Sequence, residues 1–260
     1  MQSSKRFAIL AAGVVFLSAP TLAQDMMRNV DLASPMFTKA EMTRGEVEAA
    51  AKAAGGAADF SGKSLNGLDL SGLDLKGANF RAARLNNAKL AGANLDGAAL
   101  DQVWALAADF SGASLSKASL FASQLQGAKF DSADLSGARV AADLSRASLR
   151  NAKFKDANLA ADMKNQSMGL MRVVLKSADL RGADFENANL ARADLQFSNL
   201  SGANLTGASL VGAEAGGADF RGAILDHTNV EDVDLSSARI DVAQEKAFAR
   251  ASNLQRAFKE

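Results

Sequence analysis

Few residues in this chain could carry out chemistry. Its 260 residues include one histidine, no cysteine and no tyrosine. His227 follows Leu225 by two, at a position that we expect to point outward, and it has no second histidine or cysteine with which to share a metal ion. The composition therefore excludes disulfides and thiolate zinc sites, and it leaves a single histidine for a His-based metal site or a Ser-His-Asp apparatus.

Three methionines offer the other ligand set. Met163, Met168 and Met171 lie close together, and clustered thioethers can bind Cu(I) in a secreted protein. Met168 stands two residues before Leu170, at a position that the repeat described below places inside the molecule, so filling a gap in the core is the simpler interpretation. We predict no metal site and no cofactor.

Carboxylates are abundant, but their positions argue against catalysis. They occupy the outward positions of the same repeat, on a convex surface, whereas a catalytic pair needs a cleft that drives two pKa values apart. Dinucleotide-binding, P-loop, zinc-protease and serine-hydrolase motifs are missing from the sequence. We predict no catalytic residue, and an enzyme with its site in an irregular or N-terminal segment is the least favoured functional hypothesis.

A five-residue repeat must position all of these side chains. From Phe60 to Ile240, Leu, Phe, Val or Ile fills 34 of 36 central positions, so the period does not arise by chance. Ala105 and Ala215 are the exceptions. The phase shifts by one residue after Val140 and again through an irregular step at residues 160–166. Ala usually stands two residues before the central residue, and Asp or Asn often stands one residue before it. Gly often stands two residues after it.

A period of five fits neither a helix nor a continuous strand. A helix would spread the centres around its circumference, and a strand would send them to opposite faces because five is odd. Each unit must therefore contain a short extended piece, with Ala and the centre on one face, and a corner that Gly permits. Repetition winds a coil with Leu and Ala inside and stacks its turns at strand spacing.

These residues resemble the pentapeptide-repeat family over about residues 58–241. The resemblance implies an all-β fold, a right-handed quadrilateral β-helix with four sides and 20 residues per coil, hence about nine coils. Phe60 would then lie under Phe80, and Phe110 under Phe130. Stacked coils leave open ends, so we expect short helical caps at both termini.

The cap boundaries can be read from local signals. Residues 24–57 form the N-terminal segment, in which Ser34 and Pro35 favour a short helix, Thr43 to Glu46 read as a capping box, and glycines at 55–56 end the helix. Residues 242–260 are predicted as a C-terminal capping helix opened by a second capping box, Asp241 to Gln244. Its apolar face, which could instead form a homodimer seam, would contain Phe248, Ala251, Leu254 and Phe258.

The first 23 residues read as a secretory signal peptide. Lys5 and Arg6 precede an eleven-residue apolar run, Phe7–Leu17, that is too short to span a bilayer. Small residues then lead to Ala23, after which we expect cleavage. The prediction is a periplasmic protein with no membrane span, and loss of two basic residues takes the net charge from 0 to −2.

One group of apolar residues is a candidate interaction patch. Trp104 flanks the weak centre Ala105, Leu106 lies beyond it, and Phe121 occupies an outward position. With 20 residues per coil, Phe121 would lie over Asp101, close to Trp104. Two readings stay open: an exposed contact site, or a bulge that tucks Trp104 inward.

Charge is distributed unevenly along the repeat. Nine basic residues against four acidic ones fall between Arg139 and Arg181, and ten acidic residues against three basic ones between Asp184 and Asp241. A solvated rim and a surface that steers a charged partner are both compatible with this pattern.

Two binding hypotheses follow. The first is a non-enzymatic periplasmic interaction module with an unknown protein partner and no nucleic acid. The second rests on the resemblance, because some members of the family imitate B-form DNA and bind DNA gyrase. Those members are cytoplasmic and strongly acidic, and this chain departs from them in both its signal and its near-neutral charge.

Overall fold

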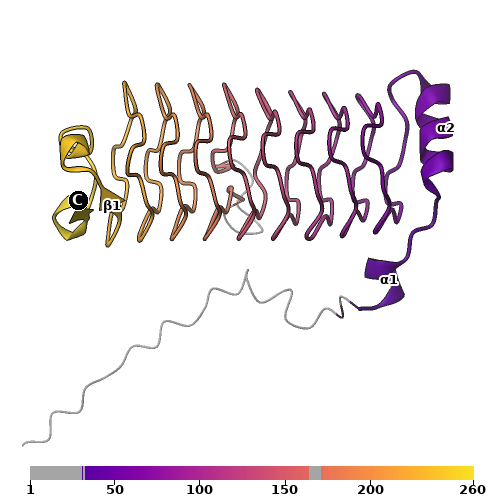
Figure 1. Ribbon diagram of the computed structural model, residues 1–260, viewed down its shortest axis with the longest axis horizontal. Coiled ribbons are helices and arrows are strands. Elements are labelled where there is room, and N and C mark those ends of the chain that lie inside the picture. The colour runs from indigo at the N-terminus through magenta and orange to yellow at the C-terminus, as the bar shows by residue number, and fades with distance from the viewer. Residues whose placement is uncertain (1–30, 32, 164–170) are drawn as a thin grey trace, which may run out of the picture. The chain divides into compact units, whose positions relative to one another are not determined.

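The five-residue units fold into the sides of a square coil, as the computed structural model in Figure 1 shows. Residues 31, 33–163 and 171–260 are described. The predicted signal peptide at residues 1–23, Met168 and Leu170 lie outside the described residues. From residue 33 onward the described chain belongs to one compact unit.

Four ladders of parallel β-bridges define the four sides. They begin at Asp59, Ser64, Asp69 and Asp74, each bridged to the residue 20 positions later, and we call the sides face 1 to face 4 in that order. The face 1 ladder continues to Asn229 through nine rungs, which confirms a stack of about nine coils. Each rung is a single residue, because the chain turns a corner directly after every central residue.

The corners explain the repeat signature. The second residue of each corner adopts a left-handed conformation, for example Gly62 at φ +67°, where glycine carries no Cβ penalty. The Asp or Asn before each centre holds the corner from outside, because its side chain accepts the N–H two residues later: Asp59 Oδ1 from Ser61 at 3.0 Å and Asn79 Oδ1 from Arg81 at 3.1 Å.

The interior is filled by the central residues and the alanines that precede them. Ala105 and Ala215 are fully buried, so the two weak centres keep their inward positions. Phenylalanine rings of neighbouring coils stack with centroids 4.7–5.1 Å apart: Phe60 on Phe80, Phe110 on Phe130, and Phe154 on Phe185. The first two pairs confirm the 20-residue register.

Both interruptions of the repeat fall at the corner between face 1 and face 2. All four ladders therefore contain one step of 19 residues and then one of 31; on face 2 these run from Gln124 to Asp143 and on to Val174. The second step is an insertion, which begins after Leu159 and is closed at its base by an antiparallel bridge between Asp162 and Met171. It is longer than the predicted irregular step at 160–166, because the apolar period alone did not show where the coil resumes.

The N-terminal cap consists of two helices. Helix α1 spans Pro35–Thr38 and helix α2 spans Arg44–Ala54. The predicted capping box is present, with the Thr43 N–H donating to Glu46 Oε2 at 2.7 Å, and Gly55 ends α2 at φ +61°. Figure 1 shows α2 covering one end of the stack, and Val47 is fully buried there.

The C-terminal cap differs from the predicted single helix over 242–260. The Asp241–Gln244 capping box forms, but it opens only a 3-10 turn, η2 (Val242–Gln244). A second turn, η3 (Leu254–Arg256), leads to strand β2 (Phe258–Lys259), which pairs in parallel with β1 (Arg239–Ile240). The chain thus returns to the face 3 ladder at its end. A strand can pair with the free backbone N–H and C=O groups of the last coil, whereas a helix uses its own groups internally.

This winding also changes which side chains cover the core. Phe248 is fully buried on Phe220, with ring centroids 5.3 Å apart. Phe258, by contrast, is 59% exposed and does not share the apolar face predicted for it.

Candidate interaction surface

The three residues of the predicted patch lie around face 2 in the third and fourth coils. Trp104 is a rung of the face 2 ladder between Arg84 and Gln124. Leu106 belongs to the corner that follows this rung, and Phe121 to the corner that leads into face 2 in the next coil; all three are half-buried. The ladder passes through Trp104 in regular 20-residue steps, so the predicted bulge is not formed.

The N-terminal segment covers part of this patch. We call residues 35–41 the strap, because they cross face 2 of the first coils. Ala40 pairs with Leu65 in an antiparallel bridge, and Asn66 Nδ2 donates to the Met36 carbonyl at 3.1 Å. The Phe37 ring packs on Trp104, with centroids 5.1 Å apart and planes inclined by 44°. Phe37 was missed from the sequence because it lies outside the repeat.

Phe121 is engaged by a cation from the next coil. The guanidinium carbon of Arg139 lies 4.2 Å from the Phe121 ring centroid, and Arg139 also pairs with Asp162 at 3.2 Å. The Phe121 N–H donates to Asp101 Oδ1 at 3.0 Å, which confirms that these residues lie one coil apart.

Unpaired polar atoms lie one coil below and above Trp104 and Leu106. Arg84 Nε, Asn86 Nδ2 and Gln126 Oε1 are buried and have no hydrogen-bond partner in the described part of the chain. Asn86 itself is 3% exposed, and its Oδ1 accepts the Leu106 N–H at 3.0 Å. A buried donor or acceptor without a partner costs about 1–3 kcal/mol, so these atoms favour a ligand group or an ordered water at this place.

The remaining predicted features carry no assembled chemistry. His227 is exposed at a corner with φ +57°, as its spacing predicted. Met163 is 49% exposed and Met171 half-buried. Among residues 31, 33–163 and 171–260, no group of three His, Cys, Asp or Glu side chains could hold a metal ion, and no helix is long and apolar enough to cross a membrane.

Surface carboxylates are held by neighbouring arginines. Arg181 Nη2 lies 2.7 Å from Asp179, and Arg221 Nη2 lies 2.6 Å from Asp219, each arginine standing two residues after its partner. Hydrogen bonds from these guanidinium groups lower the pKa of both carboxyls. Such carboxylates stay ionised and act as corner braces rather than as proton donors.

One carboxylate is buried at the base of the insertion. Asp194 is 5% exposed and lies 3.6 Å from Arg172, which makes two shorter contacts, 2.6 and 3.0 Å, with Glu214. Burial raises the pKa of Asp194 despite the nearby guanidinium. Through these contacts Arg172 ties the end of the insertion to face 2.

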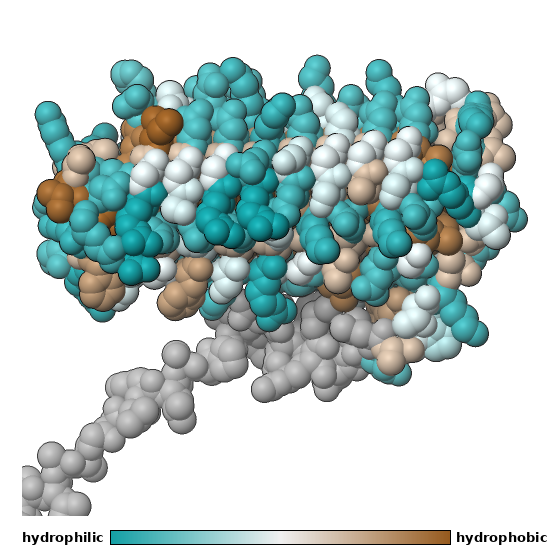
Figure 2. Space-filling view, in the orientation of Figure 1, coloured by the Kyte–Doolittle hydropathy of each residue, from teal (hydrophilic) through white to brown (hydrophobic). Residues whose placement is uncertain are grey.

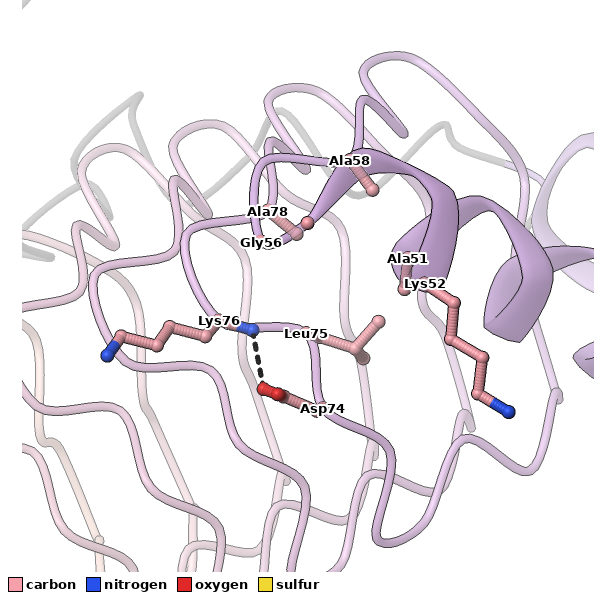
Figure 3. A pocket seen from close by; sticks show the side chains of 9 residues that line it. Ala51, Lys52, Gly56, Ala58, Asp74, Leu75, Lys76 and Ala78 are labelled. Atoms are coloured by element: carbon pink, nitrogen blue, oxygen red, sulfur yellow. Dashed lines mark hydrogen bonds between the residues drawn. The ribbon is translucent and has the colours of Figure 1, made fainter.

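A cleft of about 350 Å³ separates the C-terminal end of α2 from the first coil (Figure 3). In Figure 3 the Lys52 and Lys76 side chains point away from each other, and Asp74 turns back to accept the Lys76 N–H at 3.3 Å. Lys52 is paired with Glu48 at 2.7 Å. Charged groups do not converge on a common point in this cleft, so it offers no site for acid–base or phosphate chemistry.

Several solved structures are similar to this chain. HetL, a protein involved in heterocyst differentiation regulation in the cyanobacterium Nostoc sp. strain PCC 7120, is 26% identical, with 76% of this chain and 97% of that chain covered and a TM-score of 0.42. A trypsin-treated form of QnrB1, a plasmid-mediated fluoroquinolone resistance protein, is 16% identical, with 77% and 85% covered and a TM-score of 0.47. A thylakoid-lumen protein of Arabidopsis thaliana is 31% identical, with 49% and 64% covered and a TM-score of 0.14.

The comparison of sequences gives the family directly. No curated protein matches the chain. The model of pentapeptide repeats matches in eight copies, over residues 64–102, 107–139, 141–160, 170–207 and 198–236. The chain belongs to the pentapeptide-repeat family, whose members fold as right-handed quadrilateral β-helices.

Proposed function

We propose that this protein is a secreted, non-enzymatic interaction module of the bacterial periplasm that binds a protein partner through face 2. The N-terminal 23 residues have the charge, apolar core and small-residue end of a cleaved signal. The coil interior is packed with leucine, phenylalanine and alanine, which leaves only the outer surface for binding.

The observation that carries this proposal is the composition of face 2 around Trp104. Three half-buried apolar side chains lie on this face and at its two corners, and buried polar atoms one coil away have no hydrogen-bond partner among the described residues. The centre of a protein interface typically contains aromatic side chains with polar groups around them. The side of the molecule drawn in Figure 2 is mostly polar, with apolar side chains in small separate spots.

Site-specific photo-crosslinking in cells tests the proposal. A photoreactive residue at Leu106 should give a discrete adduct in the periplasmic fraction, and Trp104→Ala combined with Phe121→Ala should abolish it. His227→Ala, at an exposed corner elsewhere, serves as the matched control and should leave the adduct intact. Adducts that survive loss of both aromatics, or that form equally from a probe at position 227, would remove face 2 as the binding surface.

DNA mimicry with gyrase as the partner is the second candidate. The excess of acidic residues between Asp184 and Asp241 favours it. Several of these carboxylates are already neutralised by ion pairs, however: Glu186 with Lys155, Glu214 with Arg172, Asp219 with Arg221, and Glu231 with Arg250. A row of bare charges comparable to DNA phosphates is therefore not formed, and failure to inhibit gyrase supercoiling at micromolar protein would exclude this candidate.

A further inference from the structure

Phe197 combines two unfavourable features at a corner of the seventh coil. It occupies the second corner position with φ +58°, a left-handed conformation that costs a bulky residue about 1–2 kcal/mol relative to a right-handed one. Its side chain is also 63% exposed. Many coils place Gly at this position, so the fold does not require an aromatic residue there. A residue with both a strained backbone and an exposed apolar side chain does not help the fold, which indicates that Phe197 has a role in binding.

The ring is fixed in one orientation by the next coil. It lies across Gly217, where an added Cβ would stand 2.5 Å from Phe197 Cδ1, so only glycine leaves room for it. The Phe197 N–H donates to the Gly216 carbonyl at 2.9 Å. Backbone and ring are therefore held before any partner arrives, which lowers the entropy lost on binding.

Cations border the ring on the side of the preceding coils. Lys176 Nζ lies 5.9 Å from the Phe197 ring centroid. The Arg146 N–H donates to the Lys176 carbonyl at 2.9 Å. The three residues therefore follow one another, coil by coil, along the corner between faces 2 and 3. Arg146 is exposed, and no salt bridge joins either cation to a carboxylate within the described residues. Lys176 still acts on Asp194 at longer range, because its charge opposes the rise in the pKa of that carboxyl caused by burial. Other cations of these coils do pair with carboxylates: Arg150, Lys155 and Arg181.

We propose that this Phe197 ridge (Arg146, Lys176, Phe197, Gly216 and Gly217) docks a protein segment that carries an aromatic side chain flanked by carboxylates. The aromatic side chain would cover the exposed face of Phe197, and the carboxylates would meet Arg146 and Lys176. The ridge spans the fifth to eighth coils, and Trp104 lies in the third, so the ridge is a second surface and does not depend on the proposed function of face 2.

Phe197→Gly separates binding from folding in the test. Glycine relieves the left-handed strain while the ring is removed, so the melting temperature should stay within about 3 °C of that of the wild type. His227→Gly is the matched control, because it relieves the same strain, at φ +57°, on an exposed corner elsewhere. The probe is the peptide Glu-Glu-Trp-Glu-Glu, titrated calorimetrically into the full chain at low salt.

We expect Phe197→Gly to weaken binding at least about tenfold, and His227→Gly and Trp104→Ala to leave it unchanged. Arg146→Glu with Lys176→Glu should abolish binding of the acidic peptide and create binding of Lys-Lys-Trp-Lys-Lys. Equal affinity of Phe197→Gly for the acidic peptide would overturn the proposal, as would equal binding of Glu-Glu-Ser-Glu-Glu by the wild type. A melting temperature lowered by more than about 5 °C in Phe197→Gly would assign the ring to folding, and self-association lost in this variant would assign the ridge to a second copy.

Discussion

Aspartates of the repeat serve the backbone rather than a substrate. Asp59 Oδ1 accepts the Ser61 N–H at 3.0 Å and the Asn79 side-chain amide of the next coil at 2.9 Å. Hydrogen bonds from Ser61 lower the pKa of the Asp59 carboxyl. The alternation of Asp and Asn follows from this geometry, because a carboxylate accepts both bonds and an amide can accept one and donate the other.

Acid should destabilise the stack through these side chains. The folded-state pKa values of Asp179 and Asp219 are lower than about 3.9, the value expected in the unfolded chain. Their contribution to stability is thus complete above about pH 4 and is lost as the pH falls through the folded values. Denaturant midpoints measured from pH 7 to pH 2.5 should drop below pH 4, and Arg181→Gln with Arg221→Gln should flatten this drop. A midpoint independent of pH would contradict the assignment.

Asp194 should show the opposite dependence. Burial raises its folded pKa above the unfolded value, so its ionised form destabilises the fold at neutral pH and this cost vanishes below the unfolded pKa. Asp194→Asn keeps an oxygen to accept the Gln196 N–H, now at 3.1 Å, and removes the charge. The melting temperature of the variant relative to the wild type should therefore be higher at pH 7 than at pH 4. An equal difference at both pH values would show that Arg172 fully compensates the buried charge.

At the scale of elements, side chains close the open backbone edges of the stack. At the first coil, Arg44 donates to the carbonyls of Asp69 and Ser71 at 2.6 and 3.0 Å. At the last coil, Gln244 Nε2 donates to the carbonyls of Phe220 and Ala223 at 2.9 and 2.8 Å. These contacts replace backbone hydrogen bonds that a further coil would make at these edges, and they limit end-to-end pairing of coils.

Gln244→Ala tests this closure. The residue is 9% exposed, and its loss leaves two carbonyls without donors, which should cost about 2–3 kcal/mol of unfolding free energy. Glu245→Ala is the neighbouring control, because the exposed pair of Glu245 with Lys259 at 2.6 Å contributes at most about 1 kcal/mol. Urea denaturation of the three proteins gives the comparison. Similar losses for the two variants would mean that Gln244 does not cap the coil.

The elements differ in how far the sequence predicts them. Period and burial coincide in the coils, so the apolar centres predicted the five-residue units. The register of Phe60 on Phe80 was predicted only with the four sides per coil that the family resemblance implies. The insertion and the C-terminal cap follow no period, and their course depends on backbone groups of distant coils that need partners. Phe37 and Phe197 were missed for the same reason: one packs on Trp104 from outside the repeat, and the other stands at a position that the repeat assigns to glycine.

At the scale of the whole molecule, the interior is filled with side chains, so any binding must take place on the outer surface. The Trp104 patch on face 2 and the Phe197 ridge lie on different coils, and the basic and acidic stretches of the sequence divide along the same axis. Rigid stacking keeps the spacing of the two surfaces constant, because each coil is fixed by four rungs to the next. A partner that contacts both surfaces at once would bind with higher overall affinity, because the fixed spacing makes its second contact intramolecular.

Whether the protein is secreted decides which partners it can meet. If residues 1–23 act as a signal, the native protein should be found in the periplasm with an intact mass that begins at Gln24. Lys5→Glu with Arg6→Glu should retain the precursor in the cytoplasm, because the positive start directs insertion of the apolar run. Lys39→Glu, a charge change in the strap, should not alter export. A cytoplasmic protein that keeps Met1 or Gln2 would contradict the prediction. It would make the acidic stretch from Asp184 to Asp241 the leading surface and a gyrase supercoiling assay the decisive experiment.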